Sequence, residues 1–267
     1  MKGPKDLLET EDYWSTRMGL VFPGERVVFR GKDLFRELND MRWMELFLFA
    51  ITARRFSREQ VTLLEGMWVL CSSYPDPRIW NNRVAALAGT TRSTGTLGLS
   101  AANGLSEATI YGRRPDVRIF EFLNRSLNLI TDGHDLISVI KSELLKHRGI
   151  PGYARPIVNE DERIAPLMAL ASKLGFDKGL FVKHAFDIEA TLLRYRYRMK
   201  MNIAALCAAL AADQGLSSKE YYHYLLPCFI GGIVPCFIDA TEHKEGTFLP
   251  IRCSRVNYTG TRKRGWK

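Results

Sequence analysis

A loop in the middle of the chain has the composition of a ligand-binding turn. Residues 149–156 read GIPGYARP, so two glycines and two prolines surround the aromatic Tyr153 and the cationic Arg155. Glycine lets the backbone approach another molecule closely, and successive N–H groups in such a turn can face a ligand. This loop is therefore the first candidate for a binding site.

The sequence contains none of the common short motifs for nucleotides, metals or thiol chemistry. It has no G-x-x-x-x-G-K-[ST], G-x-G-x-x-G, H-E-x-x-H or C-x-x-C pattern. Its five histidines lie far apart without the spacing of metal ligands, so no metal site is predicted. Residues 90–105, TTRSTGTLGLSAANGL, lack the lysine of a phosphate loop and instead predict close packing between helices.

Composition predicts a globular protein in a reducing compartment. The 267 residues are 46% hydrophobic and 25% charged, which is enough to bury a sizeable core in one large domain or two small ones. The five cysteines are spread singly and do not form a disulfide pattern. The first lysines are followed by acidic residues at 6–12, where an export signal would be apolar. We expect a cytoplasmic protein.

Two segments raise other possibilities. Residues 221–238 are long enough to span a membrane, but they contain His223, two prolines and a glycine pair, so two buried helical segments and no membrane partner are predicted.

The net charge of the chain is +9. Basic residues near the C-terminus suit a phosphate-rich ligand, a nucleotide cofactor or nucleic acid, although a solvated tail explains the last ones equally well. They are Arg252, Arg255, Arg262, Lys263, Arg264 and Lys267.

Helical periodicity dominates the chain. Apolar residues recur at helical spacing, and Ser57 with Gln60 and Ser217 with Glu220 match the capping box that begins a helix. Alternation typical of a strand is limited to short runs such as 26–29. The sequence therefore predicts an all-α fold with a small β element near its start. Further predicted helices cover 44–53, 83–88, 117–129, 136–146, 164–174 and 186–196.

Stretches spread over nearly the whole chain carry a family resemblance. HRGIPGYARPIVNEDERI at 147–164 is the strongest of them, and KMNIAALCAAL follows at 200–210. They resemble the second and third active-site loops of citrate synthases and citryl-CoA lyases, and the chain length is similar to that of the short citryl-CoA lyase form. The other matching stretches are 13–52, 72–112, 225–243 and 248–260.

This resemblance implies a citrate synthase-like, two-domain helical architecture. A large domain would be built from 1–112 and 210–267, with a small domain over 113–209 inserted between them. The ligand would lie in the cleft between the domains, where closure excludes water. The resemblance also implies a homodimer, with apolar faces such as 84–99 packed on the second copy.

All three catalytic positions of the family carry other residues in this chain. Tyr111 stands where the resemblance places the histidine that polarises the thioester carbonyl, and Arg155 where it places the histidine that hydrogen-bonds the keto acid. Ala204 stands in place of the aspartate base. A methyl group cannot accept a proton, and loss of a general base costs about 10²- to 10⁴-fold in rate. The resemblance therefore argues against ordinary citrate synthesis.

The residues for the second substrate are kept only in part. Arg163 matches an arginine that grips the keto acid, and Arg252 or Arg255 matches one supplied by the neighbouring subunit. Asn202 matches the asparagine beside the lost base. Asp239 lies where relatives supply positive charge, so a tricarboxylate would meet repulsion. We therefore expect a different second substrate, or none.

The coenzyme A side is better preserved. Ile150, Pro151, Gly152 and Tyr153 resemble the turn whose backbone lies along the adenine of coenzyme A. Cations before Ala204 resemble those that relatives place near the coenzyme phosphates. An exposed helix end packed on acidic neighbours explains these cations equally well. They are Arg194, Arg196, Arg198 and Lys200.

Two functions of different kinds are predicted. The first is an acyl-CoA-dependent acyltransferase or lyase without a metal, in which Tyr111 donates to the thioester carbonyl and Arg155 stabilises a carboxylate or enolate oxygen. Glu107, on the face of Tyr111 if that helix continues, is the candidate base, with Asp239 or His243 as alternatives. The second is a catalytically inactive dimeric scaffold that binds coenzyme A or a partner. A nucleic-acid role comes third, because no base-reading module is present.

Overall fold

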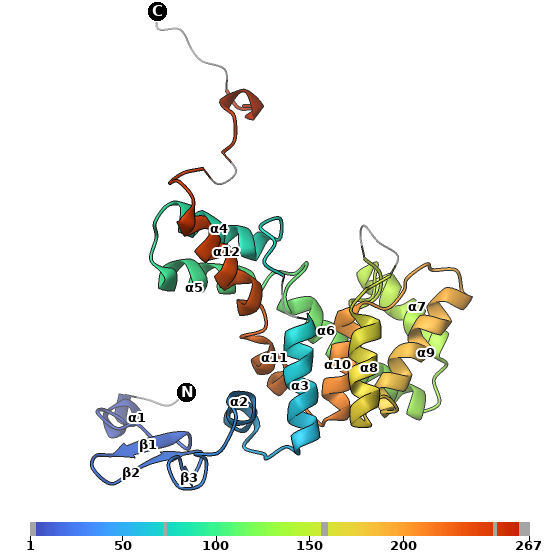
Figure 1. The fold of residues 1–267 in the computed structure, drawn as a ribbon. Helices are drawn as coiled ribbons and strands as arrows, with labels where there is room; N and C mark the ends of the chain where they lie inside the picture. The colour runs from blue at the N-terminus through green and yellow to red at the C-terminus, as the bar shows by residue number, and fades with distance from the viewer. Residues whose placement is uncertain (1–3, 72–73, 156–159, 248–249, 262–267) are drawn as a thin grey trace, which may run out of the picture.

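The computed structural model describes residues 4–71, 74–155, 160–247 and 250–261. Within these ranges the chain is mainly helical, with one small antiparallel sheet near the N-terminus, so the predicted fold class is confirmed. Figure 1 shows three parts: an N-terminal arm, a main helical bundle, and a group of three helices that stands beside the bundle.

The N-terminal arm contains the predicted β element. Strands β1 and β2 pair antiparallel, with Gly19 opposite Phe29, and β3 pairs with the other edge of β2. The strand β2 covers the run 26–29 that alternation predicts. The elements of the arm are α1 (Pro4–Glu9), β1 (Gly19–Phe22), β2 (Arg26–Phe29), β3 (Lys32–Asp33) and α2 (Trp43–Thr52).

The main bundle is built around α10 (Ile203–Asp213). Every residue of this helix from 205 to 212 is buried, and α6 and α9 pack against it. A helix that is apolar on all sides belongs in a core, so α10 holds the residues at its N-terminal end in a fixed position. The other helices of the bundle are α3 (Arg58–Cys71), α6 (Arg113–Thr131), α7 (Leu136–His147), α8 (Ile164–Leu174), α9 (Leu180–Arg194) and α11 (Ser218–Leu225).

Both predicted capping boxes are present. The backbone N–H of Gln60 donates to Ser57 Oγ at 3.2 Å, and the N–H of Ser57 donates to Gln60 Oε1 at 2.8 Å. Ser217 and Glu220 form the same reciprocal pair at the start of α11. Each box satisfies two backbone donors that a helix start leaves free, which fixes the first residues of α3 and α11.

The group of three helices consists of α4 (Trp80–Thr90), α5 (Gly95–Leu105) and α12 (Ile230–Glu242). Glycines allow the helices to approach closely. A Cβ atom added at Gly98 would lie 2.6 Å from Ala88 Cβ, and one added at Gly89 would lie 2.5 Å from the carbonyl oxygen of Phe237. The prediction that 90–105 serves close helix packing is confirmed.

The apolar stretch near the C-terminus forms two helices. By length and composition Ser218–Glu242 could cross a membrane, which is weak evidence because buried helices pass the same test. A turn at 226–229 divides it into α11 and α12, and Tyr221 and Tyr224 of α11 are buried in the main bundle. The prediction of two helical segments is confirmed.

The packing groups residues from both predicted domains. One large cluster of buried side chains includes Met44 and Leu64 together with Ile119 and Leu206. The helices α4, α5 and α12 have small clusters of their own, around Ala85 and around Ala86. The predicted domain boundaries at residues 113 and 210 describe two parts that would move relative to each other. They stay a prediction.

Candidate functional site

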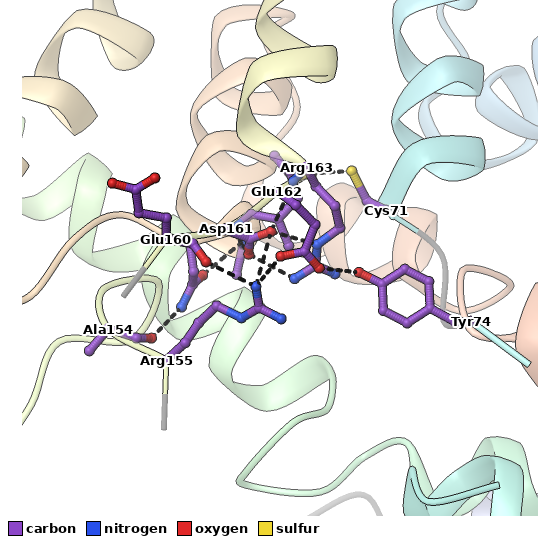
Figure 2. A network of polar contacts seen from close by, with 12 residues as sticks. Cys71, Tyr74, Ala154, Arg155, Glu160, Asp161, Glu162 and Arg163 are labelled. Atoms are coloured by element: carbon purple, nitrogen blue, oxygen red, sulfur yellow. Dashed lines mark hydrogen bonds and ion pairs between the residues drawn. The ribbon is translucent and has the colours of Figure 1, made fainter. Parts of the chain in front are cut away.

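A network of arginines and carboxylates lies at the start of α10 (Figure 2). We call Arg155, Asp161, Glu162 and Arg163 the arginine–carboxylate network. Arg163 Nε donates to Asp161 Oδ1, and Arg163 Nη2 donates to Asp161 Oδ2, both at 2.8 Å. Asp161 Oδ2 also accepts the backbone N–H of Ile203 at 2.9 Å. Asp161 therefore ties Arg163 to the N-terminal end of the central helix.

Pairing keeps both partners charged although they are buried. The side chain of Asp161 has 0% exposure. Burial raises the pKa of Asp161, but the hydrogen bonds from Arg163 and from the N–H of Ile203 outweigh burial and lower the pKa below its usual value. Burial lowers the pKa of Arg163, and Asp161 more than compensates, so the pKa ends above its usual value. The pair carries full charges at neutral pH.

Arg155, a predicted catalytic residue, belongs to the same network. Its Nη1 donates to Glu162 Oε2, and the same nitrogen lies 3.8 Å from Asp161 Oδ1. Tyr74 Oη donates to the other oxygen of Glu162 at 3.2 Å (Figure 2). The side chain of Arg155 is 25% exposed. The structure thus brings the predicted residues Arg155 and Arg163 together around one acidic loop.

Tyr111 lies in the segment between α5 and α6. Its backbone is left-handed, with φ 52°, and its ring packs on Trp80 with the ring centroids 5.5 Å apart. The side chain is 53% exposed, and its hydroxyl forms no hydrogen bond with any residue that the structure describes. The hydroxyl is therefore available to a ligand. Within the described ranges no hydrogen bond joins Tyr111 to Arg155.

The geometric premise for Glu107 as the base is wrong. Helix α5 ends at Leu105, so Glu107 and Tyr111 do not share a helical face. Glu107 Oε1 instead accepts from Arg113 Nη1 at 2.8 Å and from Tyr222 Oη at 3.3 Å. Glu107 Oε1 is therefore already occupied by contacts within the protein.

Gly152 joins the predicted coenzyme turn to α10. It has φ 82°, and an added Cβ would lie 2.8 Å from Ala205 Cβ, so only glycine fits. The N–H of Asn202 donates to the carbonyl of Gly152 at 2.8 Å, and Asn202 Nδ2 donates to the carbonyl of Ala154 at 3.0 Å. Asn202 Oδ1 also accepts the N–H of Ala204 at 3.0 Å, which caps α10. A substrate contact of Asn202 would compete with these bonds.

The side chains of this turn are mostly used in packing. Ile150 and Tyr153 are buried, and Tyr153 Oη donates to the carbonyl of Ala185 at 2.8 Å. Burial raises the pKa of Tyr153 well above its usual value. Pro151 is half-buried. The predicted contact of this turn with a coenzyme would therefore involve its backbone and Pro151.

The predicted coenzyme cations follow α9. The helix predicted over 186–196 ends at Arg194, because Arg196 and Arg198 adopt left-handed backbones with φ 64° and 49°. Both side chains are exposed, and neither forms an ion pair with a residue in the described part of the chain. Lys200 pairs with Glu160, which raises the pKa of Lys200. The acidic-neighbour explanation therefore holds for Lys200 but not for Arg196 and Arg198.

Four predicted residues lie outside the arginine–carboxylate network. Asp239 and His243 stand one turn apart at the end of α12, both exposed, with His243 Nδ1 3.9 Å from Asp239 Oδ1. Arg252 and Arg255 are exposed in the C-terminal segment, which leads away from the helices in Figure 1 and holds the short helix η1 (Cys253–Arg255). Among the residues placed by the structure, no hydrogen bond or ion pair joins these four to the network.

Sequence reasoning did not single out three side chains near this site. Asp116, in the first turn of α6, is half-buried and forms no hydrogen bond with any described residue. Burial raises its pKa to about 7, although Arg163 and Arg113 act in the opposite direction. Cys71, at the end of α3, and Cys207 of α10 have their sulfur atoms 3.4 Å apart. In the described ranges, no group of three or more histidine, cysteine or acidic residues could hold a metal.

Comparison with solved structures identifies the architecture. A citryl-CoA lyase from Hydrogenobacter thermophilus matches with a TM-score of 0.82 over 95% of this chain and 97% of its own, at 18% identity. The chain has the citrate synthase fold. A citrate synthase from Thermotoga maritima gives a TM-score of 0.66 over 85% of this chain and 60% of its own, at 15% identity.

A longer protein shares the same fold. An ATP citrate lyase variant from Methanosaeta concilii, in complex with (3S)-citryl-CoA, gives a TM-score of 0.74 at 14% identity. The match covers 98% of this chain and 45% of that protein. No protein-family model matches the sequence, and no curated protein sequence matches it either. The predicted resemblance is confirmed by structures whose citrate synthase fold this chain shares.

Proposed function

We propose that this chain is an acyl-CoA-dependent enzyme that forms or cleaves a carbon–carbon bond with a non-standard active site, and that it is not an ordinary citrate synthase. The observation that carries the proposal is the placement of Arg155 and Arg163 on one acidic loop at the start of α10. That loop is bonded to Ile203, the residue before Ala204. Two guanidinium groups in this position suit a substrate that bears a carboxylate.

Arg155 has donors left for a ligand. Its described hydrogen bonds use only Nη1, so Nε and Nη2 can donate to a carboxylate or an enolate oxygen. Arg163 donates from Nε and Nη2 to Asp161, which fixes the orientation of its guanidinium group. Tyr111, whose hydroxyl is exposed, would donate to the thioester carbonyl.

Coenzyme A is the proposed carrier of the acyl group. An ATP citrate lyase from Methanothrix soehngenii, solved with citrate and coenzyme A, matches this chain with a TM-score of 0.73 at 14% identity. Arg196 and Arg198 are exposed cations without an ion-pair partner in the described chain, which suits a phosphate group. The backbone of the turn at 150–153 would lie beside the adenine.

Isothermal titration with coenzyme A and acetyl-CoA tests this assignment. We expect micromolar binding by the wild-type protein and at least tenfold weaker binding by the double variant Arg196→Ala/Arg198→Ala. The matched control Arg17→Ala/Arg36→Ala removes the same charge from two exposed arginines of the N-terminal arm. An equal loss in both double variants would assign binding to net charge alone. Absence of wild-type binding at millimolar ligand would contradict the coenzyme proposal.

A catalytically inactive scaffold is the second candidate function. The observation that favours it is the ion pair between Glu162 and Arg155, which already neutralises the arginine at the keto-acid position. A scaffold would bind coenzyme A or a partner without turnover. If Tyr111→Phe and Arg155→Ala both leave turnover of the substrate unchanged, the proposed catalytic roles are wrong.

We also propose a cytoplasmic homodimer. Leu87 and Leu97 of the three-helix group are 43% and 66% exposed, which suits burial against a second copy. The five cysteines are free thiols, as expected in a reducing compartment. Sedimentation at low micromolar concentration should give twice the chain mass, and a tagged copy should stay in the cytoplasmic fraction. A folded monomer would contradict the dimer.

A further inference from the structure

The site needs a proton acceptor, because Ala204 has no group that can accept a proton. Ala204 lies in the first turn of α10, and Cys207 lies one turn later on the same helical face. One of the helices that pack against α10 is α6, whose first turn contains Asp116. Any group that replaces the base at Ala204 must reach this face of α10.

Asp116 lies beside that face. The hydrogen bond with Cys71, burial and the charge of Asp116 together raise the pKa of Cys207. The first turns of α6 and α10 lie close together, because a Cβ added at Gly152 would lie 2.7 Å from Ile119 Cγ1, one turn after Asp116, and 2.8 Å from the Cβ of Ala205, the residue after Ala204. Asp116 therefore lies one helical turn before a residue that meets the start of α10, and four positions after Gly112.

The carboxyl group of Asp116 is not used in folding contacts. Asp161 accepts hydrogen bonds from Arg163 and Ile203, and Glu107 accepts from Arg113, whereas Asp116 accepts none from any described residue. It is half-buried, so part of its surface remains open. A carboxylate without internal partners, placed at a helix start and shielded from bulk water, is a suitable proton acceptor.

We propose that Asp116 is the catalytic base, which removes a proton from the α-carbon of the bound acyl-CoA. This inference rests on the proposed function. The C–H bond breaks, the proton moves to the Asp116 carboxylate, and the electron pair forms the enolate, whose oxygen is stabilised by Tyr111 and Arg155. Return of the proton from Asp116 to the same carbon reverses the step.

The charged and titratable groups around Asp116 fit this role. Two cations lower the pKa of Asp116 and so favour its ionised form near neutral pH in spite of burial. The pKa values of the other neighbouring groups are raised, so these groups are neutral at that pH. The groups are Arg113 of α6, Arg163 before α8, Cys207 of α10, Tyr221 of α11 and Cys228 after α11.

Deuterium exchange into acetyl-CoA tests the proposal without a second substrate. The full chain is incubated with acetyl-CoA in D₂O, and loss of the methyl signal is followed by ¹H NMR. We expect exchange by the wild-type protein, with a rate that rises with pH up to about 7. Asp116→Asn should lower the rate by about 10²- to 10⁴-fold, while Asp116→Glu should keep part of it.

Matched measurements separate this inference from the proposed function. Asp177→Asn makes the same change at another half-buried aspartate and should leave exchange unaltered. Circular dichroism checks that each variant is folded, and titration calorimetry should give wild-type affinity for acetyl-CoA in all of them. Binding without exchange by the wild type, or full exchange by folded Asp116→Asn, overturns Asp116 as the base. Absence of acetyl-CoA binding overturns the proposed function and this inference together.

Discussion

Asp161 shows how a fully buried carboxylate is kept ionised. Its oxygens accept hydrogen bonds from the guanidinium of Arg163 and from a backbone N–H at the start of α10. These two sources of positive charge compensate the desolvation of the carboxylate. The same bonds orient Arg163, which makes Asp161 a positioning residue for the site.

Removal of this charge should destabilise the fold. In Asp161→Asn the guanidinium of Arg163 stays mostly buried without its counterion, so we expect a loss of about 3 kcal/mol in the free energy of unfolding. Because the pKa of Asp161 is lowered in the folded state, its contribution is present above the unfolded pKa and is lost as the pH falls. Urea unfolding at neutral pH measures the loss. Glu162→Gln, at a side chain with 63% exposure, is the control and should cost less than about 1 kcal/mol.

Asp116 should give the opposite pH dependence. Its pKa is raised from 3.8 to about 7, so the unfolded chain ionises first and stability falls as the pH rises between these values. Each pKa unit is worth about 1.4 kcal/mol; allowing for partial exposure, Asp116→Asn should gain roughly 2 kcal/mol over the wild type between pH 4.5 and pH 8. Urea unfolding of both proteins over this range checks it. If the stability curves of Asp116→Asn and the wild type run parallel with pH, the raised pKa of Asp116 is refuted.

The sequence predicts part of the site at the residue scale. Arg155 and Arg163 are only eight positions apart in the sequence, so their proximity follows from the chain itself. Asp116 depends on the packing of α6 against α10, which no local pattern reveals, and an acidic residue in a first helical turn is a common helix-start feature. The role of Arg113 in neutralising Glu107 is hidden for the same reason.

At the scale of the helices, the sequence predicts where α3 and α11 begin but not where α5 ends. The capping boxes at Ser57 and Ser217 fix the starts of α3 and α11. The end of α5 depends on Arg113, a residue of the next helix, so the periodicity of α5 itself does not reveal it. The buried guanidinium of Arg113 donates to the carbonyl oxygen of Asn103, and the backbone N–H of Arg113 donates to the carbonyl oxygen of Ser106. These bonds satisfy carbonyl groups at the helix end, so the helix stops before Glu107.

Two glycines of α5 should respond in opposite ways to the same change. Gly98→Ala puts a methyl group 2.6 Å from Ala88 Cβ and should cost about 1 to 3 kcal/mol by overpacking. Gly104 has no atom within 4 Å of an added Cβ, so Gly104→Ala should gain about 0.5 to 1 kcal/mol from helix propensity. Thermal denaturation of both variants measures the difference. Equal shifts of the two melting temperatures would contradict close packing of α5 on α4.

The whole molecule has more than one hydrophobic core. The large core unites α2 and α3 with α6 to α11, whereas the cores of α4, α5 and α12 are small and separate. The overall fold follows from helical periodicity and family resemblance. The distribution of the cores does not, because it depends on which faces of distant helices meet.

Separate cores should produce separate opening events. Since the three-helix group buries little apolar surface of its own, we expect its amides to exchange hydrogen before those of α6 and α10. Hydrogen exchange followed by mass spectrometry on the monomeric fraction tests this order. Calorimetry should show two transitions for the same reason. One transition, with uniform protection of all helices, would contradict the independence of the cores.

Because the C-terminal segment is exposed, its cleavage by a protease can report the assembly state of the protein. Residues 250–261 are exposed throughout, and Arg252 and Arg255 are sites at which trypsin can cut. In the isolated chain we expect the first cuts there. If these arginines reach the network of a second copy, cleavage should slow as the protein concentration rises, whereas cutting at Arg17 in the N-terminal arm should not. A digestion time course can therefore report dimer formation without any substrate.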